Sequence, residues 1–228
     1  MKAILIDDER MARQELRRLL VAHPQVEVAG EARTGEEALR LIEEHSPDVL
    51  FLDVRMPGMS GFDMLEQLDS VPQVIFTTAF DQYALKAFEV SALDYLVKPV
   101  APERLAKAIG KLKAPAQRSG IERVFVRDGE RCWLVRTADI YLLESEGNYT
   151  RLYFSNERPL VGRSLSALEE RLDPAVFFRS SRKQMINLKC VERVEPGIGD
   201  NLQVVLRGGA RVEMSRRQSA RFRAMWGL

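Results

Sequence analysis

Short apolar runs alternate with amphipathic stretches over the first half of this 228-residue chain. Five runs have the length of buried strands, at residues 2–7, 26–31, 48–53, 73–78 and 92–97. The segments between them repeat apolar residues at helical spacing, as Leu16, Leu19 and Leu20 do. Alternating strands and helices are typical of βα units around a parallel sheet. The pattern therefore predicts a flavodoxin-like, doubly wound α/β domain.

In the second half the apolar residues recur with a period of two, which predicts a mainly β domain. The strands expected there cover residues 123–127, 131–135, 140–144, 149–154, 201–206 and 210–214. Two hairpin turns are marked by glycines, one at Gly129 and one at Gly208-Gly209. A short helix is expected at residues 164–172, with Ser164 as its N-cap.

Between the two halves lies a stretch that reads as a linker. Residues 114–120 break the preceding helical pattern with a proline and continue with small and polar side chains. We therefore predict one domain at residues 1–112, a linker at 113–121 and a second domain at 122–228.

The two halves of the chain differ in net charge. The net charge of the whole chain is only +1, but a count by segments gives −6 for residues 1–111 and +5 for residues 121–228. Seventeen of the nineteen basic residues in the second half are arginine, the side chain best suited to bidentate contacts with phosphates and guanine edges. An arginine-rich genome would explain part of this bias.

The composition also helps to predict where in the cell the protein is located. No stretch approaches the roughly 20 apolar residues that span a bilayer, and the chain starts with a strand-like, acidic segment. We therefore expect a cytoplasmic protein with no membrane partner. Cys132 and Cys190 are far apart in sequence, which favours reduced, buried thiols.

Acidic and basic side chains follow the predicted strands of the first half. Asp7 and Asp8 come after the first strand, Asp53 ends the third, and Lys98 comes after the fifth. In doubly wound sheets the ligand site lies beyond the carboxyl ends of the strands. These four side chains are therefore expected to meet at one edge of the sheet.

Carboxylates in such a group repel one another unless a cation neutralises them. Mg²⁺ suits the group, because it takes oxygen ligands and is often held by one or two carboxylates plus a phosphate. A carboxylate can also attack a phosphoryl donor and form an acyl phosphate. Lys98 and a hydroxyl from Thr77 or Thr78 would then bind the phosphoryl oxygens. Taken singly, these residues could be helix caps, turn formers or exposed charges, but their joint order favours phosphoryl chemistry at Asp53.

These residues stand in motifs that resemble the receiver domain of two-component response regulators. The matching segments are Ile6-Asp7-Asp8-Glu9, Leu52-Asp53-Val54-Arg55-Met56-Pro57-Gly58, Thr78-Ala79 and Asp94-Tyr95-Leu96-Val97-Lys98-Pro99. The resemblance implies that Asp53 is the phosphoacceptor and that Asp7, Asp8 and the Arg55 carbonyl hold Mg²⁺ with it. It also implies that Thr78 and Tyr95 are switch residues, and that the bond before Pro99 is cis.

Basic residues of the second half cluster in two places. Arg179, Arg182 and Lys183 precede an apolar run, and Arg216 and Arg217 lie near the carboxyl end. Basic loops on a β scaffold suit contacts with phosphates and with the grooves of DNA. A solvated basic surface would give the same pattern. The sequence shows no helix-turn-helix, zinc-ligand or RNA-binding aromatic motif.

Residues 122–228 resemble a LytTR domain, the β-rich DNA-binding domain of regulators of the LytR/AlgR type. The matching segments are Glu144-Ser145-Glu146-Gly147-Asn148-Tyr149-Thr150, Val161-Gly162-Arg163-Ser164-Leu165 and Phe177-Phe178-Arg179-Ser180-Ser181-Arg182-Lys183-Gln184-Met185-Ile186-Asn187-Leu188. The resemblance implies that bases are read by Asn148 or Tyr149, by Arg182, and by Arg216 or Arg217. It places Arg179 and Lys183 on phosphates. One departure is Ser181, which stands where the family usually has histidine.

The sequence thus predicts a transcriptional response regulator without substrate turnover. A sensor histidine kinase would phosphorylate Asp53, the helix near residues 82–90 would change its packing surface, and homodimers would bind paired sites on double-stranded DNA. One alternative is a phosphatase of the haloacid dehalogenase type, which needs an aspartate where this chain has Arg55. Another keeps the receiver but gives the second half a protein or RNA partner.

Overall fold

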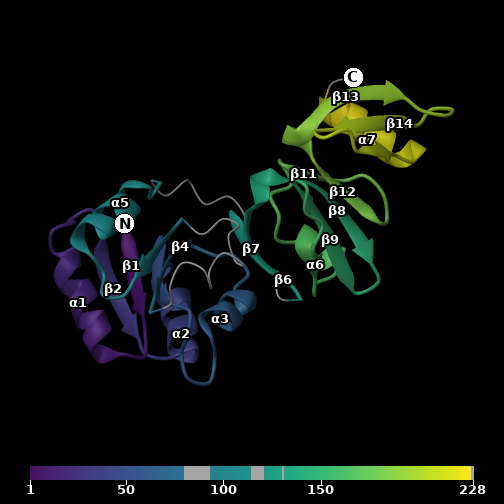
Figure 1. Ribbon diagram of the computed structural model, residues 1–228. Helices are drawn as coiled ribbons and strands as arrows, with labels where there is room; N and C mark the ends of the chain where they lie inside the picture. Colours follow the sequence, from purple (N-terminus) through teal and green to yellow (C-terminus); the bar gives the residue numbers. More distant parts are fainter. Residues whose placement is uncertain (80–92, 114–120, 130, 227–228) are drawn as a thin grey trace. The chain divides into compact units, whose positions relative to one another are not determined.

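The computed structural model describes residues 1–79, 93–113, 121–129 and 131–226 (Figure 1). The chain divides into two compact units. The first comprises Met1–Arg118 with Glu122–Phe125 and Gly129–Val135, and the second contains the remaining residues. The helix predicted near residues 82–90 and the linker segment at residues 114–120 lie outside the described residues.

A five-stranded parallel sheet forms the centre of the first unit (Figure 1). Its strands are β1 (Lys2–Ile6), β2 (Glu27–Ala32), β3 (Val49–Asp53), β4 (Gln73–Thr78) and β5 (Asp94–Val97). The order β2-β1-β3-β4-β5 is that of a flavodoxin-like doubly wound sheet, which confirms the predicted fold. β3 and β4 are buried along their whole length, as expected for inner strands covered on both faces.

Helices cover both faces of this sheet. Their bounds are Arg10–Leu20 for α1, Gly35–His45 for α2, Gly61–Gln67 for α3 and Pro102–Gly110 for α5. α1 and α5 share one hydrophobic core, and α2 and α3 share the core on the opposite face. Side-chain caps define two of the starts, because Thr34 accepts from the Glu37 amide and Ser60 forms a capping box with Asp63.

Asp94 ties α5 to the end of the sheet. Its carboxylate is buried and lies 3.0 Å from both Arg104 Nη2 and Lys111 Nζ. It also accepts a hydrogen bond from the Tyr95 amide at 2.9 Å. Burial alone would raise the pKa of the Asp94 carboxyl, but the amide of Tyr95 and the charges of Lys111 and Arg104 outweigh it and lower the pKa.

Asp94→Asn is therefore expected to lower the free energy of unfolding by about 1–2 kcal/mol at pH 7, since both basic partners are half exposed. A carboxyl with a lowered pKa stabilises the fold above its unfolded pKa, near 3.8, and loses that effect as the pH falls through its folded pKa. Urea unfolding of both proteins between pH 7 and pH 3 should show the difference shrinking below about pH 4. A difference that stays constant over this range would contradict the assignment.

Most of a hairpin from the second half of the sequence belongs to the first unit. It consists of β6 (Arg123–Asp128) and β7 (Arg131–Arg136), and Phe125, Cys132 and Leu134 enter the core beneath α2 and α3. The Phe125 ring stacks on the Phe62 ring with 6.0 Å between their centroids. The hairpin was predicted from the sequence, but its participation in this core was not.

The second unit is mainly β, as predicted, and its two sheets are antiparallel. The five-stranded sheet contains β8 (Ile140–Glu146), β9 (Tyr149–Phe154), β10 (Leu160–Val161), β11 (Phe177–Arg179) and β12 (Gln184–Asn187), in the order β10-β9-β8-β12-β11. The three-stranded sheet contains β13 (Val191–Pro196), β14 (Leu202–Leu206) and β15 (Arg211–Glu213). The remaining elements are the helices α6 (Leu165–Glu169) and α7 (Arg216–Trp226) and two short 3₁₀ turns, Thr137–Asp139 and Leu188–Cys190.

Apolar residues from both sheets and from α7 meet in one core of the second unit. Phe222 of α7 is fully buried and meets Phe178 of β11 edge to face, with 5.5 Å between the ring centroids. The helix predicted at residues 164–172 is present as α6, which ends earlier, at Glu169, and Ser164 caps it as predicted by accepting from the Ala167 amide. α7 was missed, because its arginines obscure the apolar period.

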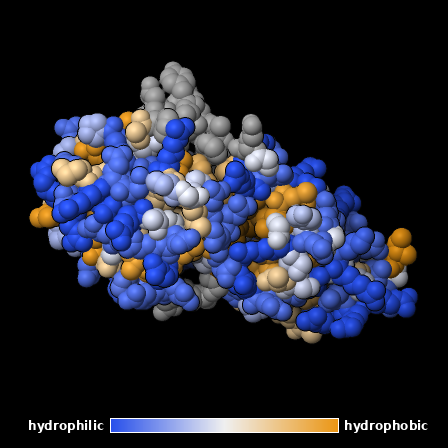
Figure 2. Space-filling view, turned by 90° about the horizontal axis from the view of Figure 1, so that it is seen from below, coloured by the Kyte–Doolittle hydropathy of each residue, from blue (hydrophilic) through white to orange (hydrophobic). Residues whose placement is uncertain are grey.

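Most of the surface visible in Figure 2 is hydrophilic. Among the described residues, no helix has the length and apolar character needed to cross a membrane. Cys132 and Cys190 are both buried and are not joined in a disulfide, as predicted.

Candidate functional site

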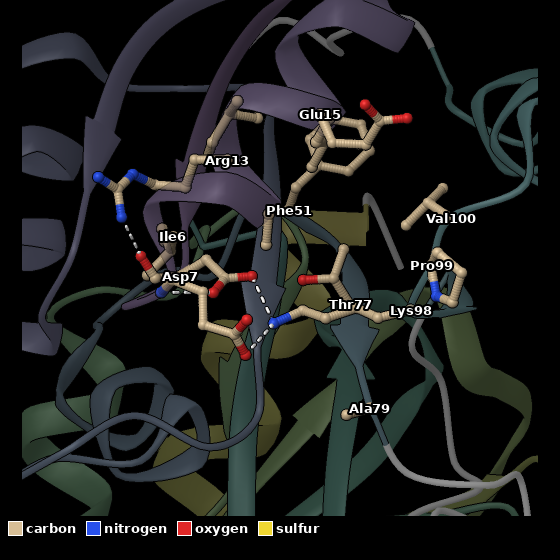
Figure 3. Close-up of a pocket in the computed structure, with 14 residues that line it drawn as sticks. Ile6, Asp7, Arg13, Glu15, Phe51, Thr77, Ala79, Lys98, Pro99 and Val100 are labelled. Atoms are coloured by element: carbon tan, nitrogen blue, oxygen red, sulfur yellow. Dashed lines mark hydrogen bonds and ion pairs between the residues drawn. The ribbon is translucent and has the colours of Figure 1, made fainter.

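Asp7, Asp53 and Lys98 meet at the carboxyl edge of the parallel sheet. The ammonium of Lys98 lies 2.7 Å from the Asp7 carboxylate (Figure 3). It also lies 2.5 Å from the Asp53 carboxylate. Both aspartates are buried, and the Lys98 side chain is only 14% exposed. The peptide bond between Lys98 and Pro99 is cis, as the resemblance implied. The predicted convergence of strand ends is thus present in the structure.

Burial and pairing act in opposite directions on these charges. Burial raises the pKa of Asp7 above its ordinary value, although hydrogen bonds from Lys98 and the Glu9 amide counteract it. For Lys98, burial alone would lower the pKa, but hydrogen bonds with Asp53 and Asp7 outweigh burial and raise it. The lysine therefore stays protonated beside the two carboxylates.

The donor set of this cluster suits a hard divalent cation. One carboxylate oxygen each from Asp7, Asp8 and Asp53 lie within 4.8 Å of one another. Asp8 is exposed, so the cluster opens to solvent. The amides of Glu9 and Arg55 donate to Asp7 and Asp53 at 3.0 Å and hold those carboxylates in place. Oxygen ligands with room for water are the arrangement that Mg²⁺ prefers.

The two candidate hydroxyls lie on opposite faces of β4. Thr77 lines the cavity beside Lys98 (Figure 3). Thr78 is buried and lies two residues after Phe76, hence on the face of the sheet that carries α2 and α3. On that face Phe76 stacks on Tyr95, with 5.4 Å between the ring centroids. Thr78 and Tyr95 therefore share one face of the sheet.

Arg13 is part of the site although the sequence did not single it out. Its Nη1 donates to the Asp7 carbonyl at 2.6 Å, and its Nε pairs with Glu31 at 3.2 Å. The guanidinium thus fixes the turn that carries Asp7 and Asp8. Arg13 also lines a cavity of about 350 Å³ that runs from Asp7 between α1 and Val100. The only feature of the sequence that could have indicated this role is that Arg13 is a basic residue one turn into the helix that follows Asp7 and Asp8.

In the second unit, the β8–β9 turn and the β11–β12 loop lie side by side. The Ser145 amide donates to the Lys183 carbonyl at 2.7 Å, and β12 pairs with β8 in the five-stranded sheet. The candidate DNA-binding residues Asn148, Tyr149, Arg182 and Lys183 are all exposed at this end of the sheet. The structure therefore brings these four together.

The other candidate DNA-binding residues are placed differently. Arg216 and Arg217 are exposed in the first turn of α7. Arg179 is only 17% exposed and is paired with Glu169 of α6 at 2.8 Å. Ser181, in the place of the usual histidine, uses its hydroxyl within the loop by accepting from the Lys183 and Gln184 amides.

A polar network supports the base of this loop. Gln184 donates to Glu144 at 3.1 Å, and the Tyr153 hydroxyl donates to the same carboxylate at 2.8 Å. Burial and the neighbouring Glu144 charge raise the pKa of Tyr153 to about 12, so its hydroxyl remains a hydrogen-bond donor at neutral pH. Side chains therefore join β12, which carries one end of the loop, to β8 and β9, in addition to the backbone pairing of these strands.

Comparison with protein families gives two matches along the chain. Residues 3–110 match the response regulator receiver domain, and residues 130–227 match the LytTr DNA-binding domain. Both families agree with the resemblances found in the sequence. The limits proposed for the linker remain a prediction.

Two relatives are similar to this chain over its whole length. A protein named sensory transduction protein LytT from Enterococcus faecalis is 32% identical over 245 residues, with all of both chains covered. An uncharacterized response regulatory protein from Vibrio cholerae is 34% identical over 238 residues and covers 100% of this chain and 99% of its own.

Two solved structures are each similar to one half. The LytTr DNA-binding domain of a putative methyl-accepting/DNA response regulator from Bacillus cereus is 20% identical, with a TM-score of 0.45 and coverage of 48% of this chain and 100% of its own. The response regulatory domain of the protein mrkE from Klebsiella pneumoniae is 34% identical, with a TM-score of 0.44 and coverage of 49% of this chain and 94% of its own.

Proposed function

Since the chain belongs to the response regulators that join a receiver domain to a LytTR DNA-binding domain, we propose that Asp53 is its phosphoacceptor. The observation that carries this proposal is the place of the Asp53 carboxylate. It is buried at the end of β3, 2.5 Å from the Lys98 ammonium and next to Asp7 and Asp8. A sensor histidine kinase is the proposed donor in the cytoplasm.

The transfer itself requires little from the protein beyond positioning. One oxygen of the Asp53 carboxylate attacks the phosphorus of the donor, the bond from phosphorus to the donor breaks, and the donor leaves with that electron pair. Lys98 is placed to bind one phosphoryl oxygen, and the hydroxyl of Thr78 would bind another. The product is an acyl phosphate on Asp53.

Mg²⁺ is the proposed cofactor of this step. Asp7, Asp8 and Asp53 would hold it with the carbonyl oxygen of Arg55. When bound, Mg²⁺ neutralises the negative charge that the carboxylates and the phosphoryl oxygens bring together. Arg13 keeps the turn of Asp7 and Asp8 in position through the Asp7 carbonyl.

The phosphoryl group acts by shifting a conformational equilibrium. We propose that Thr78 moves toward the new charge and that Tyr95, on the same face of the sheet, changes its packing against Phe76. The phosphoryl group shifts the equilibrium only by the difference between its interaction free energies with the two conformations. The shifted state is proposed to dimerise and to bind paired sites on double-stranded DNA.

DNA contact is assigned to the exposed residues of the second unit. Asn148 or Tyr149, Arg182, and Arg216 or Arg217 would reach base edges in successive major grooves, and Lys183 would contact a phosphate. Arg182 and Lys183 share a loop that lies beside the β8–β9 turn, so they would approach one groove together with Asn148 and Tyr149.

Selection from random duplex DNA tests this function. The full chain, with acetyl phosphate and Mg²⁺, is expected to enrich a motif present in two copies at fixed spacing, with affinity falling steeply as salt rises. Footprinting with and without the phosphodonor would then show whether phosphorylation is needed. Enrichment of no motif would favour an RNA or protein partner and contradict a role in transcription.

A phosphatase is the competing enzyme function. Phosphatases of the haloacid dehalogenase type need an aspartate two residues after the nucleophile, and Arg55 stands there. We propose that the chain accepts a phosphoryl group and slowly loses it without turning over other substrates. Rapid Mg²⁺-dependent hydrolysis of simple phosphate esters would overturn this proposal.

A further inference from the structure

The loop that joins β11 to β12 has an unusually well-fixed backbone for a segment that carries exposed arginine and lysine. The amides of Ser180 and Ser181 both donate to the Gln184 carbonyl, at 3.0 and 3.1 Å. The hydroxyl of Ser181 accepts from the Lys183 amide at 3.2 Å and from the Gln184 amide at 3.0 Å. Arg182 lies at the tip of this four-residue loop and is exposed.

The guanidinium of Arg179 holds the same loop from the side. Its Nε donates to the Ser181 carbonyl at 2.8 Å, and its Nη2 donates to the Arg182 carbonyl at 2.6 Å. The third nitrogen, Nη1, pairs with Glu169 of α6 at 2.8 Å. Every nitrogen of the fork is thus engaged, and the carboxylate of Glu169 offsets the charge.

These contacts fix the two peptide planes on either side of Arg182. The Ser181 carbonyl belongs to the plane before Arg182, and the Arg182 carbonyl belongs to the plane after it. The second plane is also held from its amide end by the Ser181 hydroxyl. Since φ and ψ of a residue are set by its two neighbouring peptide planes, the direction of the Cα–Cβ bond from which the Arg182 side chain extends is set as well.

We propose that Arg179, anchored by Glu169, is a positioning residue that aims Arg182 at its base pair. This inference rests on the proposed DNA binding. It competes with the prediction from the sequence that Arg179 contacts a phosphate. A phosphate at Arg179 would approach the Glu169 carboxylate, which repels it, whereas a positioning role uses that carboxylate as the anchor.

Arg179→Lys separates the two roles, because lysine keeps the charge but lacks the planar fork that reaches two carbonyls. The base pair read by Arg182 is identified first. It is the position in the DNA site at which a base-pair substitution weakens binding of the unaltered chain but does not weaken binding of Arg182→Ala. At that position, Arg179→Lys is expected to reduce the discrimination between right and wrong base pairs about tenfold, within the range of one bidentate contact. The slope of log K against log salt should not change.

Three comparisons complete the experiment. In the Arg182→Ala background, Arg179→Lys should cost no further discrimination, since the two residues act through one contact. Lys183→Ala should lower the magnitude of the salt slope by about one and leave discrimination intact. Glu169→Ala leaves Arg179 in place but removes its anchor, and it should also reduce the discrimination between base pairs at the Arg182 position. This variant tests the proposal if Arg179→Lys does not fold.

Undiminished discrimination in Arg179→Lys or Glu169→Ala would overturn the inference and leave DNA binding intact. A salt slope reduced by about one in Arg179→Gln would also overturn it, in favour of a phosphate contact. If the unaltered chain enriches no DNA motif at all, the proposed function fails, and the positioning role fails with it.

Discussion

Asp53→Asn is expected to abolish the incorporation of phosphate from acetyl phosphate in the presence of Mg²⁺. The amide that replaces the carboxylate has almost the same shape but lacks the negative oxygen that attacks phosphorus. The fold should survive, because the amide oxygen can still accept from the Arg55 amide and Lys98 keeps its contact with Asp7. Intact-mass measurement would show the phosphoryl group on the unaltered chain and its absence from the variant.

Asp69→Asn is the matched control for this experiment. It makes the same chemical change at an exposed aspartate of the same unit, and it should leave phosphate incorporation unchanged. A hydroxylamine-sensitive phosphoryl group that persists on Asp53→Asn would mean that another carboxylate is the acceptor. Thermal unfolding of both variants shows that any loss is chemical and does not come from misfolding.

The position of the Asp53 carboxylate could be predicted because it depends on a simple chain of rules. Apolar runs give buried strands, parallel strands place their carboxyl ends at one edge, and polar residues that follow such strands therefore meet. Asp7, Asp53 and Lys98 obey this reasoning and come together in the structure. No knowledge of the helix packing was needed for them.

Residues that act through backbone carbonyls could not be found in this way. Arg13 holds the Asp7 carbonyl, and Arg179 holds the Ser181 and Arg182 carbonyls. These contacts depend on the direction of a loop, which the period of apolar residues does not determine. The sequence pattern therefore does not distinguish an arginine that holds a loop by hydrogen bonds from an arginine that binds a phosphate.

The packing of the β6–β7 hairpin could not be predicted from the sequence, for a different reason. The alternation in 123–127 and 131–135 predicts which residues point to a core, but it does not say which core. Phe125 joins the core beneath α2 and α3, where Phe62 stacks on it. The predicted domain limits follow the change of pattern along the sequence, whereas this contact follows the fold.

Phe125→Ala is therefore expected to destabilise the first unit by about 3 kcal/mol, the lower end of the range for buried phenylalanine. The ring is 9% exposed and begins a row of aromatic contacts through Phe62 and Phe76 to Tyr95. Removing it leaves a cavity against Phe62 and opens the edge of that core to water. Hydrogen exchange followed by mass spectrometry should show reduced protection of the amides in β4.

Phe154→Ala is the control, because Phe154 is also buried but belongs to the second unit. It should reduce protection in β8 and β9 and leave β4 unchanged. If Phe125→Ala leaves the protection of β4 unchanged, the hairpin does not stabilise the first unit. If it does reduce that protection, the core that contains Tyr95 includes Phe125, which lies beyond the predicted linker. A change in the packing of Tyr95 would then reach the β6–β7 hairpin through two rings, Phe76 and Phe62, which gives the proposed switch a physical route out of the sheet.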